Sequence, residues 1–407
     1  METLFWVSAL VVAYVYAGYP ALLAIWARLA GRPVRRRPSF ERRNWPIVSV
    51  IIAAHNERAR LPGRLANLLN QSYPGPVEIV VVSDGSTDDT AAAVGQFGDA
   101  VRYIEVARGG KPLALNAGVA AATGSILVFA DARQRFSPDA ILHLVSNFDD
   151  PDVGGVTGEL ILDCEHDDPT GSTIGDGVGL YWTYEKWLRR HESLIRSTLG
   201  ATGAIYAIRR VLYEPIPEDT ILDDVLIPLR IVRAGYRVLF EPEARAYDGA
   251  SATAGQEFVR KVRTIAGMFQ LLTREIWVFD PFRNAVWFET ISHKALRLAM
   301  PALQTLVLTA NIRLAAIPVY RVVLAAQMLF YAAALMGYLM RGARRPIAIV
   351  TLPYTICLLS WATMVGFAHF LMGRQKATWE RVTATAAAAM EPVAASAGFV
   401  DRRRTVR

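Results

Sequence analysis

Long apolar segments lie at both ends of this chain, and they constrain its fold more than any other feature. Residues 4–30 carry no charged side chain before Arg28, and further apolar segments cover residues 296–317, 322–340 and 347–372. A helix of about 20 apolar residues crosses the hydrocarbon of a bilayer. We therefore predict an N-terminal transmembrane anchor (residues 1–31) and a C-terminal transmembrane region (residues 296–373). The first C-terminal segment is the weakest, because Pro301 interrupts it and Asn311 and Arg313 lie near its end.

The charged residues are concentrated between and beside these apolar segments. The chain has 407 residues and is 53% hydrophobic, yet it carries 44 basic and 37 acidic side chains. This segregation predicts one soluble domain (residues 45–250), amphipathic interface helices (251–295) and a polar tail (374–407). Cys164 and Cys357 are far apart in sequence, so no disulfide framework is expected and a reducing compartment is permitted.

The basic residues beside the first apolar segment predict its orientation. No basic region precedes the segment, and it is longer than the core of about 7–15 residues in a signal peptide. The positive-inside bias places the basic flank in the cytoplasm, so we predict an integral protein of the inner membrane with a cytoplasmic soluble domain. The net charge of +7 is explained in this way, and no nucleic-acid partner is expected. The arginines concerned are Arg28, Arg32, Arg35, Arg36, Arg37, Arg42 and Arg43.

The basic residues of the C-terminal part do not settle its topology. One cluster lies at Arg341, Arg344 and Arg345, and another lies around Arg374 and Lys376. Both favour the cytoplasm, although one apolar segment separates them. The number of C-terminal spans stays open.

The soluble domain alternates between apolar runs and helical segments. Residues 48–54 form a continuous apolar run that is typical of a strand buried on both faces of a parallel sheet. Helices are predicted at 61–71, 91–97 and 112–122, and further strands at 78–82, 101–105 and 125–130. This βαβα period predicts an α/β doubly wound sheet with ligands at the carboxyl ends of its strands.

Polar side chains follow three of these strands, where a ligand is expected. Glu57 follows the first, Asp84 the second and Asp131 the fourth. The sequence has no GxGxxG between strand and helix and no P-loop lysine pattern. It therefore lacks the main motifs that would indicate a dinucleotide oxidoreductase or a P-loop NTPase.

These segments together resemble the family 2 glycosyltransferases, which include cellulose, chitin and hyaluronan synthases and many bacterial surface-glycan enzymes. The resemblance rests on VSVIIAAHNE (48–57), EIVVVSDGSTDDT (78–90) and GKPLALN (110–116), in this order and between membrane segments. It implies a GT-A fold, a nucleotide-sugar donor and an inverting transfer.

The resemblance also implies which residues hold the donor. Asp84 would accept hydrogen bonds from the uracil or related base, with Glu57 nearby and Lys111 adding a positive charge. Asp131 falls where the family has an Asp-x-Asp motif that holds Mg²⁺ or Mn²⁺ on the donor diphosphate, but this sequence reads Asp131-Ala132-Arg133. Two alternatives follow: a divalent ion held by Asp131 and phosphate oxygens, or direct pairing of Arg133 with the diphosphate.

The same resemblance assigns the acceptor side. Asp224 matches the general base, which takes the proton of the attacking acceptor hydroxyl, and Asp223 supports it. Gly203 lies in TGAIYAIRR (202–210), which resembles an acceptor-side loop. Arg260 and Arg263 lie on a predicted amphipathic helix where processive members carry Gln-x-x-Arg-Trp, and they are candidates for phosphates or lipid headgroups.

The sequence therefore predicts an inverting glycosyltransferase with a nucleotide-sugar donor, which we expect to be a UDP-sugar. The predicted acceptor is a lipid-linked or growing cell-surface glycan. A processive polysaccharide synthase is the first alternative, although the tryptophan of the processive signature is replaced by Thr264. An inactive glycosyltransferase-like scaffold of an export complex and a membrane nucleotidyltransferase are further alternatives.

Overall fold

The computed structural model describes residues 1–35, 44–163, 173–249, 254–340 and 348–375. Several residues used in the sequence analysis fall outside these ranges. They are Cys164, Arg36, Arg37, Arg42, Arg43, Arg341, Arg344, Arg345 and the tail from Lys376 onward.

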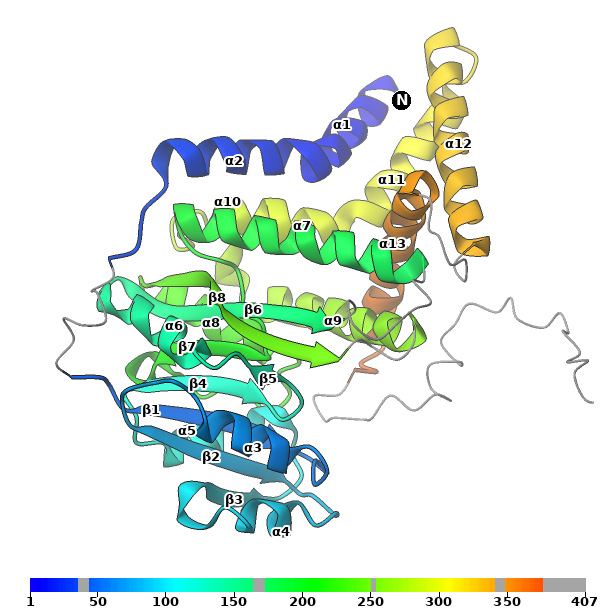
Figure 1. The fold of residues 1–407 in the computed structure, drawn as a ribbon. Helices are drawn as coiled ribbons and strands as arrows, with labels where there is room; N and C mark the ends of the chain where they lie inside the picture. Colours follow the sequence, from blue (N-terminus) through cyan, green and yellow to red (C-terminus); the bar gives the residue numbers. More distant parts are fainter. Residues whose placement is uncertain (36–43, 164–172, 250–253, 341–347, 376–407) are drawn as a thin grey trace, which may run out of the picture.

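One eight-stranded sheet forms the scaffold of the part of the protein below the apolar helices in Figure 1, in the order β3-β2-β1-β4-β7-β6-β8-β5. Its first half consists of four neighbouring parallel strands, as predicted. They are β1 (Val48–Ala54), β2 (Val77–Asp84), β3 (Arg102–Val106) and β4 (Ile126–Asp131). All seven residues of β1 are buried, because strands flank it on both sides and helices cover both faces.

The second half of the sheet is mixed, which the strand-helix alternation did not predict. β7 (Ile205–Arg209) runs antiparallel to β4 and to β6 (Val153–Asp163), and β8 (Arg237–Gly249) runs parallel to β6. The short strand β5 (Arg135–Phe136) closes the far edge antiparallel to β8. The chain departs from strict alternation because β5 follows β4 without a crossover helix.

Helices cover both faces of the sheet and bury its alternating side chains. On one face, α3 (Leu61–Leu69) and α6 (Ala140–Ser146) pack on a core that includes Val50 and Ile52. On the other, α5 (Lys111–Ala121), α8 (Asp223–Arg233) and α9 (Ala254–Arg274) pack on a core that includes Ile51. The doubly wound arrangement is thus confirmed, and it brings the starts of α5 and α8 to the same face.

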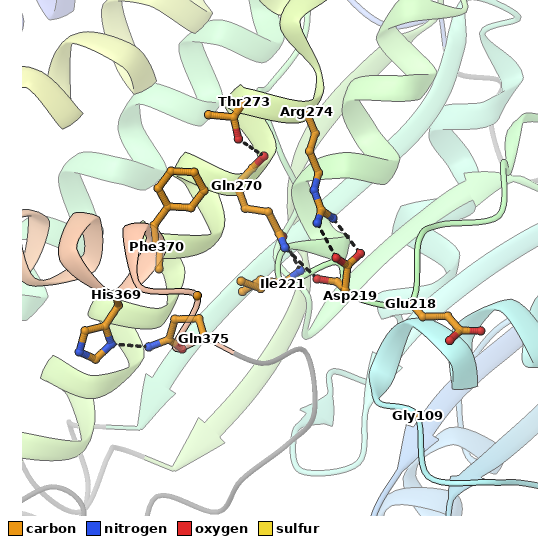
Figure 2. Close-up of a pocket in the computed structure, with 12 residues that line it drawn as sticks. Gly109, Glu218, Asp219, Ile221, Gln270, Thr273, Arg274, His369, Phe370 and Gln375 are labelled. Carbon is orange, nitrogen blue, oxygen red and sulfur yellow. Dashed lines mark hydrogen bonds and ion pairs between the residues drawn. The ribbon is translucent and has the colours of Figure 1, made fainter.

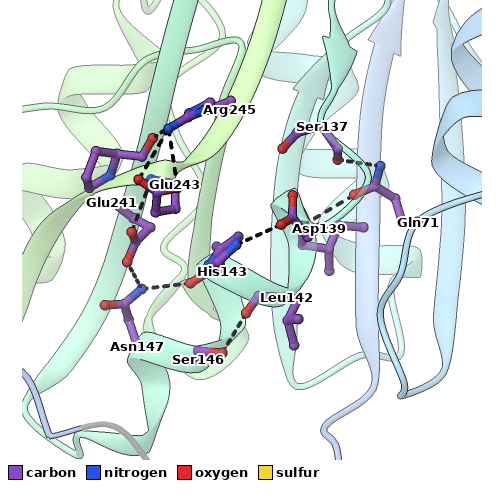
Figure 3. A network of polar contacts seen from close by, with 12 residues as sticks. Gln71, Ser137, Asp139, Leu142, His143, Ser146, Asn147, Glu241, Glu243 and Arg245 are labelled. Carbon is purple, nitrogen blue, oxygen red and sulfur yellow. Dashed lines mark hydrogen bonds and ion pairs between the residues drawn. The ribbon is translucent and has the colours of Figure 1, made fainter. Parts of the chain in front are cut away.

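A polar network fixes α3 and α6 to the sheet (Figure 3). Asn147, at the end of α6, donates to the buried Glu241 of β8 at 2.9 Å, and His143 pairs with Asp139 at 3.0 Å. Gln71, after α3, donates to the carbonyl of Ser137 at 2.9 Å. These contacts hold α3 and α6 in place next to the turn between β4 and β5.

Four helices of the described residues are long and apolar enough to cross a membrane. They comprise Glu2–Ala30, Trp287–Arg313, Pro318–Leu339 and Ile349–Leu371. The second includes the predicted weak segment and begins earlier, at Trp287, with a π-helical turn at Thr290–Ala295. These helices lie together on one side of the sheet, and α7 (Thr173–Ile195) lies between the sheet and α2 (Tyr19–Ala30) (Figure 1).

Candidate active site

The ends of β1 and β2 meet in a polar cluster that holds the loop before α5. His55 contacts the carbonyl oxygen of Asp84 through Nδ1 at 2.7 Å, and Arg108 contacts Nε2 of His55 at 2.8 Å. Because arginine has no acceptor, Nε2 accepts and Nδ1 carries the proton. The histidine therefore links β1, β2 and the loop in one tautomer.

Asp84 is buried beneath this loop. Its carboxylate accepts the backbone N–H of Gly109 at 2.7 Å and that of Gly110 at 3.0 Å, and only 1% of the residue is exposed. Gly110 has φ 96°, a conformation that glycine adopts without the penalty of a side chain. In this structure Asp84 is thus a positioning residue for the turn that carries Lys111.

Lys111, the first residue of α5, brings two carboxylates together. Its Nζ lies 3.1 Å from Oδ1 of Asp131, at the end of β4, and 3.2 Å from Oδ2 of Asp223, at the start of α8. Burial opposes the charged amine, but Asp131, Asp223 and Asp224 outweigh it and raise the pKa of Lys111. The lysine stays charged at neutral pH and joins the sheet edge to α8.

Asp224 lies beside this ion-pair cluster and accepts the backbone N–H of Gly203 at 3.2 Å. Burial and Asp223 raise the pKa of Asp224 to about 6, against the opposing charges of Lys111 and Arg189. A carboxyl group that titrates near neutral pH is suited to accept a proton from a reacting hydroxyl. The Cα of Gly203 approaches so closely that an added Cβ would lie 3.1 Å from Oδ2 of Asp224.

The altered acidic motif offers one carboxylate to a divalent ion. Arg133 does not point to Asp131 but pairs with Asp248 of β8 at 2.8 Å. Within the described ranges, no cluster of three or more histidine, cysteine, aspartate or glutamate side chains is arranged to hold a metal. Such ions are often held by one or two carboxylates with phosphate oxygens and water, so Asp131 fits as the one protein ligand of a donor-bound ion.

A pocket of about 590 Å³ opens beside this cluster, between the loop at Gly109, the residues before α8, α9 and the end of α13 (Ala348–Leu371) (Figure 2). Arg274 of α9 pairs with Asp219, and Gln270 donates to the carbonyl of Asp219 at 2.9 Å and accepts the N–H of Ile221 at 3.1 Å. Helix α9 therefore positions the loop that leads into Asp223 and Asp224.

Comparison with known proteins identifies the folded core. A family model described as Glycosyl transferase family 2 matches residues 49–215, from β1 to the loop before α8. This segment is a family 2 glycosyltransferase domain. The chain is 25% identical over 239 residues to a poly-beta-1,6-N-acetyl-D-glucosamine synthase of Staphylococcus epidermidis, covering 56% of each protein. It is 26% identical over 266 residues to a probable glycosyltransferase, YdaM, of Bacillus subtilis, covering 58% of this chain and 61% of that protein.

A solved structure shows the same fold. A mannosyltransferase from Pyrobaculum calidifontis, in complex with GDP-Man and Mn²⁺, covers 91% of this chain and 100% of its own, with a TM-score of 0.67 and 23% identity. The predicted GT-A fold and the family resemblance are therefore confirmed. The chain spans little more than half the length of the curated relatives that it matches.

The structure brings some predicted site residues of this glycosyltransferase domain together and leaves others apart. Asp84, Lys111, Asp131, Gly203, Asp223 and Asp224 form one connected site. Glu57 lies at the same strand edge but pairs locally with Arg60 at 2.8 Å. On α9, Arg260 lies 3.9 Å from Glu257 of the same helix.

Sequence reasoning missed residues whose roles depend on the packing of distant elements. Arg189 of α7 donates to Oγ1 of Thr202 at 2.8 Å and lowers the pKa of Asp224, opposing the effect of burial. Asp248, the partner of Arg133, is 117 positions further along the chain than Asp131. The one local signal was the aromatic segment 181–190, which includes Arg189.

Proposed function

We propose that this chain is an inverting glycosyltransferase that moves a sugar from a nucleotide-sugar donor to a lipid-linked or growing glycan at the membrane. The observation that carries the proposal is Asp224, a half-buried carboxyl group with a raised pKa beside the Lys111–Asp131 pair at the ligand edge of a family 2 domain. The cytoplasmic placement of this domain is part of the proposal and is supported by the arginines after the first apolar helix.

The chemistry divides between the two sides of the site. The acceptor oxygen attacks the anomeric carbon as the bond from that carbon to the diphosphate oxygen breaks, and the acceptor proton passes to Asp224. Lys111 lies where it can stabilise the negative charge that grows on the leaving diphosphate. Asp84 keeps Lys111 in place through the N–H groups of Gly109 and Gly110, and contact of Asp84 or Glu57 with the nucleoside belongs to the proposal.

A divalent ion, Mg²⁺ or Mn²⁺, is proposed as a cofactor, with Asp131 as its protein ligand. When bound, it would neutralise charge on the donor diphosphate. We expect EDTA to stop transfer and added Mn²⁺ or Mg²⁺ to restore it, measured with radiolabelled donor. Full activity in EDTA would instead support direct binding of the phosphates by side chains such as Arg133.

The central test uses membranes that contain the protein and a panel of labelled UDP-GlcNAc, UDP-glucose and GDP-mannose. The proposal expects label from one donor to enter lipid or glycan in the wild type but not in Asp224→Asn. Membranes without the protein are the control. If no donor is consumed although UDP binds, the chain is a scaffold, and release of pyrophosphate would indicate a nucleotidyltransferase.

Processive synthesis is the second candidate, because a matched relative is named a poly-beta-1,6-N-acetyl-D-glucosamine synthase. Against it, Thr264 stands where the processive signature has tryptophan. Product length by gel filtration separates the two: a single-sugar adduct excludes the synthase, and long chains establish it.

A further inference from the structure

A loop with exposed apolar side chains joins α9 to the next candidate membrane helix. It covers residues 275–286, between Arg274 at the end of α9 and Trp287, where the helix Trp287–Arg313 begins. Phe282 is 97% exposed, the largest value among the large hydrophobic residues that the structure describes, and Ile276 and Phe279 are also exposed. Single exposed hydrophobic residues are common, but three within seven residues mark a candidate contact surface.

A buried asparagine holds this loop in one conformation. Nδ2 of Asn284 donates to the carbonyl of Val278 at 2.7 Å and to Oγ1 of Thr290 at 3.0 Å. Its Oδ1 accepts the N–H of Val286 at 3.0 Å. These bonds join the loop to the first turns of the helix that follows. The turn that presents Phe282 is therefore preformed.

The end of this loop lies beside the end of α2. Phe288 contacts Trp26, with ring centroids 5.8 Å apart. Arg196, after α7, joins both elements: its guanidinium lies 5.0 Å from the ring of Trp26, and its Nη1 donates to the carbonyl of Ala285 at 2.5 Å. Figure 1 shows the same arrangement, with α10 (Trp287–Glu289) next to α2. The loop is thus found where two candidate membrane helices end.

The side chains at these two helix ends are typical of a membrane–water interface. Trp26 lies in the last turns of α2, and Trp287 is the first residue of α10. Tryptophan is enriched at the headgroup level of membranes. Arg28 follows Trp26, Arg283 follows Phe282, and both arginines are exposed. Basic side chains at this level are attracted to anionic lipid headgroups, so the charges here suit a lipid surface.

The chain connection also keeps Phe282 close to a bilayer. Four residues separate Phe282 from Trp287, so their Cα atoms lie less than about 18 Å apart. Apolar side chains at a membrane surface enter the boundary between headgroups and acyl chains by about 5–10 Å. A second copy of the chain is the other occupant to consider, but the tryptophan and arginine neighbours favour lipid.

Helix α9 joins this loop to the candidate active site. Arg274, the residue before the loop, donates to Oδ1 of Asp219 at 2.8 Å. One turn earlier, Gln270 accepts the N–H of Ile221 at 3.1 Å. Both contacts hold the segment that leads into Asp224. A lipid contact at the loop therefore acts on the helix that positions the proposed base.

From this arrangement we infer that the loop at residues 275–286 inserts Phe282 into the interfacial layer of the bilayer and holds the α9 end of the active site at the membrane surface. The inference rests on the membrane placement in the proposed function and goes beyond it, because spanning helices alone do not require a lipid contact at this loop. The partner is a lipid surface, with Arg283 at the level of the headgroups.

The test measures the depth of residue 282 in the full chain. Phe282→Cys, combined with Cys164→Ser and Cys357→Ser, is labelled with the fluorophore NBD and reconstituted in nanodiscs of phosphatidylcholine and phosphatidylglycerol that hold one copy. NBD emission moves to shorter wavelength in lipid, and nitroxide-labelled lipids quench it at known depths. We expect a nitroxide near the headgroup to quench the label at least about 2-fold more than one at the acyl chain end.

Two further positions calibrate this measurement in the same background. Asp99→Cys places the label in the exposed turn after α4 (Thr90–Gly95), far from the membrane helices in Figure 1, and should report water. Leu10→Cys places it on an exposed position of α1 (Glu2–Ala13) and should report the acyl chains. Melting temperatures show whether each labelled protein folds. Because Phe282 is exposed, its replacement should leave the melting temperature unchanged.

The outcomes separate this inference from the proposed function. A label at residue 282 that reports water, while the label at residue 10 reports lipid, would overturn the inference alone. Shielding of residue 282 without quenching by any nitroxide lipid, or only in nanodiscs with two copies, would assign the loop to a protein contact and overturn it as well. Water at residue 10 would contradict the membrane placement itself. Shallow quenching at residue 282 in a protein that transfers no sugar would support the inference and contradict the proposed function.

Discussion

The proposed donor side and the proposed acceptor side of this site are built in different ways. The donor side consists of strand ends and one loop: Asp84, the turn at Gly110 and Lys111 come from adjacent parallel strands and the helix that follows. The acceptor side consists of side chains from α7, α8 and α9 and from the β7 loop, which meet only through packing. Backbone contacts dominate the first, and side-chain charges dominate the second.

This difference predicts which substitutions should affect each side most. The loop at Gly109 and Gly110 is held by hydrogen bonds from two backbone N–H groups to the Asp84 carboxylate. Removing this carboxylate should disorder the whole loop, so donor affinity should depend on few residues. The pKa of Asp224 reflects several neighbouring charges. Removing one of these charges should therefore shift the pH profile of the transfer reaction without abolishing the reaction.

The largest effect is expected at the base. Asp224→Asn removes the proton acceptor and should lower the transfer rate by about 10²–10⁴-fold, while UDP affinity stays within about 2-fold. Labelled-sugar transfer and calorimetry measure the two quantities. Asp99→Asn, an exposed acid in the turn after α4 (Thr90–Gly95), is the control. Retained turnover in Asp224→Asn would reject the assignment.

The next effect is expected on the donor side. Asp84→Ala leaves the N–H groups of Gly109 and Gly110 without their buried acceptor and loosens the turn before Lys111. Each charge-assisted hydrogen bond contributes about 1.5–3 kcal/mol, so UDP affinity should fall by about 10–100-fold. Asp84→Asn keeps one acceptor oxygen and should lose less. Equal UDP affinity in all three proteins would show that the turn does not depend on Asp84.

A smaller effect is expected from Gly203→Ala. Its new Cβ would lie 3.1 Å from Oδ2 of Asp224 and 3.5 Å from Nζ of Lys111, so the base must shift by a few tenths of an ångström. We expect transfer to fall by about 10-fold, because misplaced catalytic groups lose much of their effect. Gly63→Ala, where an added Cβ meets nothing within 4 Å, is the matched control. A loss of UDP binding larger than the loss of transfer would place Gly203 on the donor side instead.

The smallest effect is a shift in pH dependence. The base must be ionised, so kcat/KM should rise with pH through the Asp224 pKa of about 6. Arg189→Gln removes a positive charge that favours the ionised form, so the pKa rises and the acidic limb moves to higher pH. Arg196→Gln, seven residues further along the chain, is the control and should leave the acidic limb of the pH profile in place. A limb that moves to lower pH in Arg189→Gln would contradict the assigned electrostatics.

Much of the donor side could be predicted from the sequence because its signals are local. Continuous apolar runs at 48–54 and 125–130 marked β1 and β4, and the acids that follow them mark the ligand edge. The apolar segments at 4–30, 322–340 and 347–372 correspond to candidate membrane helices. Hydrophobic period and length depend on the sequence alone, so these features do not require a tertiary structure.

The pairing of the charged side chains, in contrast, follows from the way distant segments pack together. The sequence offers Arg133 as one of two alternatives for the diphosphate, and in the structure its side chain pairs with Asp248, which the mixed half of the sheet brings beside it. The resemblance predicts that Asp84 binds the nucleoside base, and the structure adds that its carboxylate is buried and accepts the N–H groups of Gly109 and Gly110. Likewise, Arg189 of α7 reaches Thr202 in the loop before β7, a contact that no local pattern of the sequence indicates. Electrostatic partners are set by distance in space, and that distance follows from how the helices pack on the sheet.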